Sequence, residues 1–395
     1  MQKILGQISR EQLFGAVLMR KSFLLTFICF MLLFFNNIYG QTDTAVTSAG
    51  TTTAPAQKKD APKPALIAVV GGTLIDGTGK EPVPNSVILI EGNKIKTVGP
   101  ATQVKIPKEA QKIDATGKFV LPGFIDCHIH LGTETSRLEY YQDSNSLATL
   151  RALQLMNNYL RCGVTAVRDV GSPIETMQAL LRAQRNGYID SIRLYPCGDL
   201  ITITGGHAYT MHGALAVNGP WEWRRAVREM YAAGFKHIKI SPQFTLEEAR
   251  AAVEEAKTLG LHITAHGGGG SDTIPPTMTK IAIEAGVECI EHLNEMDDEA
   301  LDLMAEKGVF DVPTLQTYYA SYQRNDIGSF LIEKRGWSMA MHETLFKKAY
   351  ARHILMGIGT DANGEYRELY PGIYFDEMRY FVRLGMSPME AIVCA

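Results

Sequence analysis

The chain has 395 residues, 46% of them hydrophobic and 21% charged, a balance typical of a globular protein that can bury a sizeable core. The formal net charge of -3 at pH 7 provides no basic surface and argues against a nucleic-acid-binding protein. The cysteines are scattered and include no CxxC pair, which indicates buried free thiols rather than a disulfide framework or a cysteine-bound zinc.

The first forty residues have the pattern of an export signal. The positive run Met19-Arg20-Lys21 precedes an apolar stretch from Phe23 to Phe35, and Gly40 is a small residue before a cleavage point at Gln41. The apolar stretch is too short for a stable membrane span. We therefore expect residues 1–40 to be a signal peptide and the mature protein to be periplasmic or secreted. Residues 41–64 are rich in Thr, Ala, Pro and Lys and predict a disordered linker.

A small β-unit is predicted next, over residues 65–118. Strand patterns cover 66–70, 86–90 and 94–98, and Glu91-Gly92-Asn93 forms a tight turn between the last two. A unit of this size is marginal on its own, so we expect it to pack onto another part of the chain.

From Phe119 onward, apolar strand patterns alternate with helical ones. Helices are expected near 146–161, 174–185 and 221–233, from the capping box Thr245/Glu248 to Leu259, up to Ala285, over 299–306, and in a long region ending at Arg352. Eight strand–helix units are the number that closes a (β/α)8 TIM barrel, in which active sites lie at the carboxyl ends of the strands. We therefore predict an α/β barrel domain over residues 119–395. Its strands are expected at 124–130, 164–169, 192–196, 235–240, 262–266, 287–292, 309–313 and 354–361.

Candidate metal ligands fall at the ends of these predicted strands. His128 and His130 are two residues apart on one strand, so their imidazoles share a face and form half of a transition-metal site. A histidine at a strand end is more often structural than not, but five such positions and a lysine at one rim are hard to explain by packing. The remaining members of this set are Lys239, His266, His292 and Asp361.

Taken in order, these motifs resemble those of the metal-dependent amidohydrolase superfamily, and most closely its imidazolonepropionase and Xaa-Pro dipeptidase (prolidase-like) branch. The similarity runs from about Leu66 to the last residue. Gly71-Gly72-Thr73-Leu74-Ile75-Asp76-Gly77 is similar to the family's N-terminal β-unit. The barrel motifs are Leu121-Pro122-Gly123-Phe124-Ile125-Asp126-Cys127-His128-Ile129-His130, Thr165-Ala166-Val167-Arg168-Asp169, His237-Ile238-Lys239-Ile240, Thr264-Ala265-His266, Ile290-Glu291-His292 and Gly359-Thr360-Asp361.

The resemblance implies a centre of two divalent metal ions, usually Zn²⁺. His128, His130 and Asp361 would bind the more buried ion, and His266 and His292 the more exposed one. Lys239 would be N6-carboxylated and bridge both ions. This agrees with its chemistry, since a carbamate is an anionic oxygen ligand whereas a bare ammonium would repel the metals. The alternative is an ordinary lysine beside a single-metal site.

The implied reaction is hydrolysis of an amide or peptide C–N bond by a metal-activated hydroxide, with Asp361 as general base and then general acid. His207, in Thr204-Gly205-Gly206-His207-Ala208-Tyr209, resembles the family's substrate-polarising histidine. Tyr209 and Arg168 are further substrate-binding candidates, although a structural ion pair with Asp169 is the simpler explanation of Arg168.

Family members continue past the eighth barrel helix and complete a small β-sandwich. Here a capped helix begins at Ser387 and the sequence stops at Ala395, so we expect the C-terminal half of that sandwich to be missing. The leading prediction is an exported dipeptidase, and the alternatives are a cyclic amidohydrolase similar to imidazolonepropionase and a non-catalytic, truncated metal-binding protein. We expect a small-molecule or dipeptide substrate and no nucleic-acid partner, and we leave homo-oligomerisation open.

Overall fold

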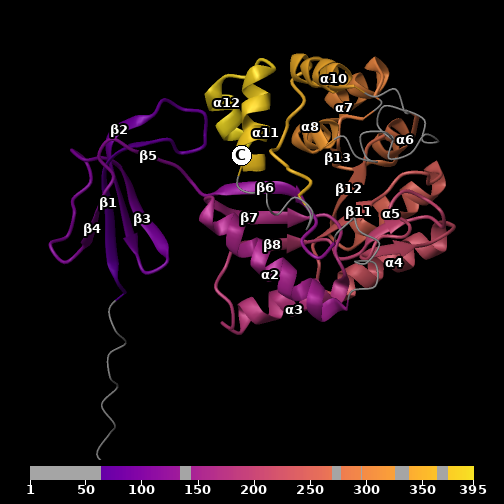
Figure 1. Cartoon of the computed structure of the whole chain (residues 1–395), viewed down its shortest axis with the longest axis horizontal. Helices are drawn as coiled ribbons and strands as arrows, with labels where there is room; N and C mark the ends of the chain where they lie inside the picture. The colour runs from indigo at the N-terminus through magenta and orange to yellow at the C-terminus, as the bar shows by residue number, and fades with distance from the viewer. Residues whose placement is uncertain (1–63, 134–143, 269–276, 295, 325–337, 363–371) are drawn as a thin grey trace, which may run out of the picture. The chain divides into compact units, whose positions relative to one another are not determined.

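The computed structural model describes residues 64–133, 144–268, 277–294, 296–324, 338–362 and 372–395 (Figure 1). The predicted signal peptide and nearly all of the predicted linker lie outside these residues, and they stay predictions. In the part of the chain that is described, no helix has both the length and the apolar character needed to cross a membrane.

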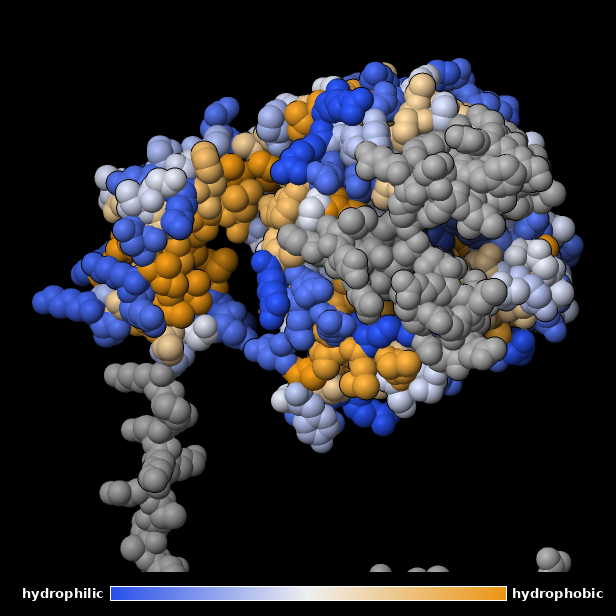
Figure 2. Space-filling model, viewed as in Figure 1, coloured by the Kyte–Doolittle hydropathy of each residue, from blue (hydrophilic) through white to orange (hydrophobic). Residues whose placement is uncertain are grey.

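The N-terminal unit is a five-stranded sheet in which β1 is central. The predicted tight turn is confirmed, and Gly92 adopts a φ of 62° between β2 and β3, a conformation that suits glycine. Figure 2 shows hydrophobic residues gathered on this sheet, where Ile95 and Phe119 are 68% and 67% exposed. The interpretation of this sheet as part of a β-sandwich remains a prediction. The strands are β1 (Leu66–Leu74), β2 (Val83–Glu91), β3 (Lys94–Pro100), β4 (Gln111–Asp114) and β5 (Phe119–Val120), in the order β3-β2-β1-β4 with β5 paired to β1.

Nine parallel strands follow in two sheets, with helices arranged around them (Figure 1). Most residues of these strands are buried, as expected for parallel strands covered on both faces. The three-stranded sheet has the order β6 (Phe124–Ile129), β7 (Val164–Asp169), β8 (Arg193–Pro196). The six-stranded sheet has the order β10 (Ala214–Ala216), β9 (Leu200–Thr202), β11 (His237–Ile240), β12 (His262–His266), β13 (Cys289–Glu291), β14 (Phe310–Val312).

The predicted eighth strand at 354–361 is wrong as a continuous element. This segment makes only isolated parallel bridges, Met356 with Asp311 of β14 and Ala362 with Ile129 of β6. Glycine at Gly357 and Gly359 disfavours a regular strand, because glycine loses the most conformational freedom on folding. The segment nevertheless lies between the two sheets, since it contacts the last strand of one and the first strand of the other.

The structure differs from the prediction in two further places, both in segments that connect the predicted strands. The stretch 198–219, in which no strand was predicted, contains the short strands β9 and β10. The long helical region before Arg352 contains α8 and α10, with 325–337 between them outside the described residues. The capping box at Thr245 and Glu248 is confirmed. The helices are α2 (Asn145–Arg161), α3 (Ile174–Arg185), α4 (Pro220–Ala232), α5 (Leu246–Thr258), α6 (Thr277–Ala285), α7 (Asp298–Lys307), α8 (Leu315–Arg324), α10 (Met339–Ala351), α11 (Gly372–Arg383) and α12 (Pro388–Val393).

Candidate metal centre

Four histidines come together at the carboxyl ends of the strands. His128 lies in β6 and His130 directly after it, His266 ends β12, and His292 follows β13. The ring centroids of His128 lie 5.3 Å from those of His130 and 4.7 Å from those of His292, and the His266 and His292 centroids are 4.4 Å apart. Four imidazoles that are far apart in sequence therefore form one continuous cluster.

The carboxylate of Asp361 completes this cluster. Its Oδ1 lies 3.4 Å from Nε2 of His128 and 3.3 Å from Nε2 of His130. Candidate ligand atoms of His128, His292 and Asp361 all lie within 4.8 Å of one another. Burial would raise the pKa of Asp361, but its contacts with His128 and His130 hold that pKa well below the usual value, so it is a carboxylate. Imidazole nitrogens with a carboxylate oxygen are the donor set that zinc-like ions prefer.

Asp361 is held in place from β6. The Asp126 carboxylate accepts a hydrogen bond from the Thr360 hydroxyl at 2.7 Å and another from the Thr360 backbone N–H at 3.1 Å. The backbone N–H of Asp361 donates to the carbonyl of His128 at 2.8 Å. These hydrogen bonds fix the position of the Asp361 carboxylate relative to β6, although the segment that carries it is not a regular strand.

The histidines are oriented through their second ring nitrogens. Nδ1 of His130 lies 2.9 Å from the carbonyl oxygen of Gly171, which can only accept, so this nitrogen carries the hydrogen. Nδ1 of His128 lies 2.7 Å from the carboxylate of Glu291, and Nδ1 of His292 lies 2.5 Å from the hydroxyl of Thr314. In the neutral form of an imidazole whose Nδ1 carries the hydrogen, the lone pair is on Nε2. Nε2 is the nitrogen that faces the Asp361 oxygen in both His128 and His130, so a cation bound between them would find imidazole and carboxylate donors together.

Two further buried atoms support the same conclusion. Nε2 of His266 and Nζ of Lys239 are buried and make no hydrogen bond within the described part of the chain. Burial lowers the pKa of Lys239, which favours the neutral amine over the ammonium. A buried polar atom without a partner costs about 1–3 kcal/mol. Taken together, these donors fit a divalent metal centre.

Three residues around the site have positive φ angles, 71° at His292, 50° at Thr314 and 52° at Asp361. A β-branched threonine is rarely found in this region, and strained residues of this kind cluster at functional sites. The turn at His292 also interrupts the alternation expected of a strand. Glu291 and His292 are consecutive, yet both lie against His128.

The three predicted substrate-binding residues lie in different surroundings. The ring of His207 lies 4.2 Å from that of His266, beside the histidine cluster. Tyr209 is 44% exposed and, within the described residues, makes no hydrogen bond or ring contact with the cluster. Arg168 does not pair with Asp169. Its Nη2 donates to Glu291 at 2.6 Å, and its Nε donates to the carbonyl of Cys127 at 2.6 Å.

The expected pair between Arg168 and Asp169 is thus corrected. Asp169 instead accepts hydrogen bonds from the N–H of Leu131 at 2.7 Å and the hydroxyl of Ser172 at 2.7 Å. It thereby fixes the chain just after His130. The alternation along β7 explains the correction, because neighbouring residues on a strand point in opposite directions.

Sequence reasoning missed the residues that support the ligands. Glu291, Thr314 and the carbonyl of Gly171 each contact Nδ1 of one candidate ligand histidine. The available signal for Glu291 was its place beside His292 in the motif Ile290-Glu291-His292, but strand alternation predicts that it points away from the site.

Comparison with known proteins identifies the class. The profile of the amidohydrolase family matches residues 119–395, which is most of the chain, and the chain belongs to this family. The parallel strands and surrounding helices accordingly represent the TIM-barrel fold of amidohydrolases. The protein is a hydrolase that acts on carbon–nitrogen bonds.

Individual relatives are similar over most of the chain. Ochratoxinase from Aspergillus niger is 28% identical over 382 residues, covering 83% of this chain and 74% of the relative. The crystal structure of a Xaa-Pro dipeptidase with bound methionine superposes with a TM-score of 0.72 at 30% identity, covering 84% of this chain and 87% of the other. A prolidase complexed with N-methylphosphonate-L-proline gives a TM-score of 0.73 at 28% identity, covering 84% and 86%.

Proposed function

We propose that this protein is an exported, metal-dependent dipeptidase of the prolidase type. The observation that carries the proposal is the convergence of His128, His130 and Asp361, with Nε2 atoms of both histidines 3.4 and 3.3 Å from one carboxylate oxygen. Similarity to a Xaa-Pro dipeptidase at 30% identity supports dipeptides as the substrate class. Export rests on the pattern of the first forty residues.

The proposed ligands are His128, His130, His266, His292, Asp361 and Lys239. When bound, divalent ions lower the pKa of a coordinated water and polarise a carbonyl oxygen. We propose that Lys239 contributes as its N6-carbamate, formed when the neutral amine adds carbon dioxide and releases one proton. Its lowered pKa and its buried, unpaired Nζ support this, since only the neutral amine is nucleophilic.

The chain's own residues move the proton and orient the substrate. In the proposed reaction Asp361 accepts the proton of the attacking water on a carboxylate oxygen and passes it to the leaving nitrogen. The hydrogen bonds from Thr360 to Asp126, and from the Asp361 backbone N–H to the His128 carbonyl, hold this carboxylate in place. His207, beside His266, would donate a hydrogen bond to a polar group of the substrate and orient the scissile bond.

The test is a panel of dipeptides, with proline and with other residues in the second position, set against cyclic amides. We expect hydrolysis of dipeptides by the full chain, and loss of it in His128→Ala and Asp361→Asn. Hydrolysis of cyclic amides alone would favour the alternative similar to imidazolonepropionase. Bound metal without turnover of either group would indicate a non-catalytic protein. Unchanged activity in both variants would contradict the proposal.

A further inference from the structure

A second buried carboxylate lies behind the metal centre. Glu291 is completely buried, and its carboxylate makes polar contacts with residues of three other strands. Its Oε2 accepts from Nδ1 of His128 at 2.7 Å, and its Oε1 accepts from Nη2 of Arg168 at 2.6 Å and from the hydroxyl of Thr264. The side chain therefore joins β6, β7, β12 and β13 at one point.

The contacts define the direction of each hydrogen bond. A guanidinium only donates, and at 2.6 Å in a buried setting it forms a charge-assisted pair with a carboxylate. An ionised carboxylate only accepts, so the hydrogen between Glu291 and His128 belongs to the imidazole. His128 then has its Nδ1 protonated, and in the neutral imidazole the lone pair is on Nε2, which faces Asp361 and His292.

Building on the proposed function, we propose that Glu291 is a positioning residue for His128. It locks the imidazole in the tautomer that presents Nε2 to the metal centre, and Arg168 and Thr264 hold the carboxylate in place. Supporting partners of this kind fix the orientation of metal-binding histidines, and their loss typically costs about 10- to 100-fold in metal affinity.

His128 differs from the other ligands in this respect. Nδ1 of His130 is held by a backbone carbonyl and Nδ1 of His292 by a neutral hydroxyl. Only the partner of His128 carries a charge, among the ligand histidines whose Nδ1 contacts are described. Replacing the charged Glu291 by a neutral residue should therefore disturb the orientation of His128. His130 and His292 have no comparable charged partner among these described Nδ1 contacts.

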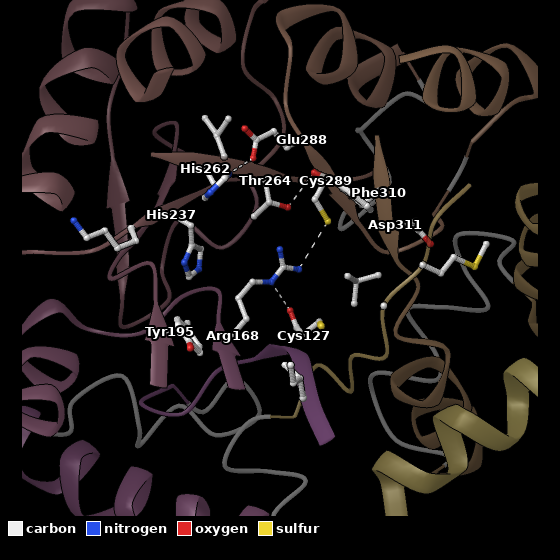
Figure 3. A pocket seen from close by; sticks show the side chains of 16 residues that line it. Cys127, Arg168, Tyr195, His237, His262, Thr264, Glu288, Cys289, Phe310 and Asp311 are labelled. Carbon is white, nitrogen blue, oxygen red and sulfur yellow. Dashed lines mark hydrogen bonds and ion pairs between the residues drawn. The ribbon is translucent and has the colours of Figure 1, made fainter. Parts of the chain in front are cut away.

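Arg168 can be reached from the opposite end of the strands. A cavity of about 470 Å³ lies there, and Figure 3 shows the guanidinium of Arg168 within it, between Cys127 and Cys289. The side chain of Arg168 is 23% exposed, whereas that of Glu291 is fully buried. The cavity walls come from the first residues of several strands, including His237, His262 and Phe310. Truncating Arg168 would extend this cavity to the Glu291 carboxylate.

That geometry allows chemical rescue. In Arg168→Ala we expect metal affinity to fall by about 10- to 100-fold, because the Glu291 carboxylate loses its counter-charge. Millimolar guanidinium or methylguanidinium should enter the enlarged cavity, pair with Glu291 and restore much of the affinity. Sodium chloride at the same concentration should not. The same guanidinium should leave Glu291→Gln unrescued, because that variant lacks the carboxylate.

The decisive experiment measures the tautomer and the metal affinity separately. ¹⁵N-histidine NMR of metal-free full chain, with the His128 signals identified through His128→Asn, should show protonated Nδ1 in the wild type and a mixed population in Glu291→Gln. Zinc affinity, measured by competition with a chelator, should fall by about 10- to 100-fold in Glu291→Gln. Glu288→Gln is the matched control, because Glu288 contacts Nδ1 of His262 at 2.6 Å on the exposed side of the barrel.

The outcomes distinguish this inference from the proposed function. A wild-type chain that binds no zinc would overturn the proposed function, while the tautomer measurement would still test Glu291. Wild-type affinity and tautomer in Glu291→Gln would overturn the inference even if the enzyme is a dipeptidase. If Arg168→Ala does not fold by circular dichroism, Thr264→Val replaces it, with a smaller expected loss of zinc affinity. An unchanged affinity in that folded variant would count against the role of Thr264.

Discussion

Basic side chains lie at both ends of the parallel strands, but the two ends differ in how these side chains are hydrogen-bonded. At the carboxyl ends, Nε2 of His266 and Nζ of Lys239 are buried without hydrogen-bond partners in the described part of the chain. At the amino ends, His237 contacts the carbonyl of Asp169 at 3.2 Å, and His262 pairs with Glu288 at 2.6 Å. A histidine whose polar atoms are satisfied has nothing left to offer a ligand. Burial without a hydrogen-bond partner among the described residues therefore marks His266 and Lys239 as candidate ligands more clearly than residue type does.

Asp311, at the amino ends, is an exception to this difference in hydrogen bonding. Asp311 is fully buried and lines the cavity, and both of its carboxylate oxygens lack hydrogen-bond partners within the described residues. Burial, with the negative charges of Glu291 and Glu377 nearby, raises its pKa well above the ordinary value. The protein thus accommodates Asp311 as a neutral acid, whereas it keeps Asp361 ionised.

The largest expected effect comes from removing the charge at the carboxyl ends. Asp361→Asn should lower kcat/KM by about 100- to 10,000-fold, because the amide can neither accept the water proton nor pass it on. Steady-state kinetics on the best dipeptide checks this. Asp190→Asn, at an exposed position, is the control and should match the wild type. Equal activity of Asp361→Asn and the wild type would remove Asp361 from the proposed reaction.

A substitution of intermediate effect tests the close packing around His128. A Cβ on Gly359 would lie 2.3 Å from Cγ1 of Val312 and 2.8 Å from Cβ of His128. Gly359→Ala should therefore destabilise the fold by about 1–3 kcal/mol and weaken zinc binding. Urea unfolding and chelator competition measure the two effects. Gly372→Ala is the control, since a Cβ there meets nothing nearer than 3.9 Å among the described residues.

The next prediction concerns pH and Asp311. Because its pKa is raised in the folded protein, the folded state keeps a proton that the unfolded chain has already lost. The contribution of Asp311 to the free energy of unfolding is therefore greatest at low pH and falls as the pH rises above the ordinary aspartate range, by at most about 1.4 kcal/mol per pH unit. Urea unfolding at several pH values should show a shallower slope in Asp311→Asn. An identical slope in both proteins would contradict the assignment.

The smallest effect is expected at the exposed pair between His262 and Glu288, whose side chains are 77% and 43% exposed. Glu288→Gln should change the free energy of unfolding by less than about 1 kcal/mol, because solvent screens such pairs. Zinc affinity should stay the same. A large loss of zinc affinity would show that the two ends of the strands are coupled.

Much of this arrangement was predictable from local patterns. Alternation along β6 placed His128 and His130 on one face, and the apolar runs before His266 and His292 marked buried strands. The segment 354–361 contains Gly357 and Gly359 and makes only isolated bridges, so the prediction of a strand there was wrong. Asp361 nevertheless lies beside His128, as expected. Asp361 reaches the site through tertiary hydrogen bonds that its neighbour Thr360 donates to Asp126, and no local pattern encodes them.

The supporting residues were harder to predict for a related reason. Strand alternation points Glu291 away from the side of His292, but the positive φ of His292 brings both side chains against His128. Arg168 was weighed against Asp169, its neighbour in sequence, while its actual partner is 123 positions away. Partners this far apart in the chain cannot be matched to each other from a single sequence.

The central claim is that the carboxyl ends of the strands form a metal centre, and zinc binding to the full chain tests it most directly. Equilibrium dialysis followed by elemental analysis should find about two zinc ions per chain, with fewer in His128→Ala. About one ion would retain the hydrolase and argue against a bridging Lys239. A folded wild-type chain that binds no zinc, or a His128→Ala variant that binds as much as the wild type, would contradict the account.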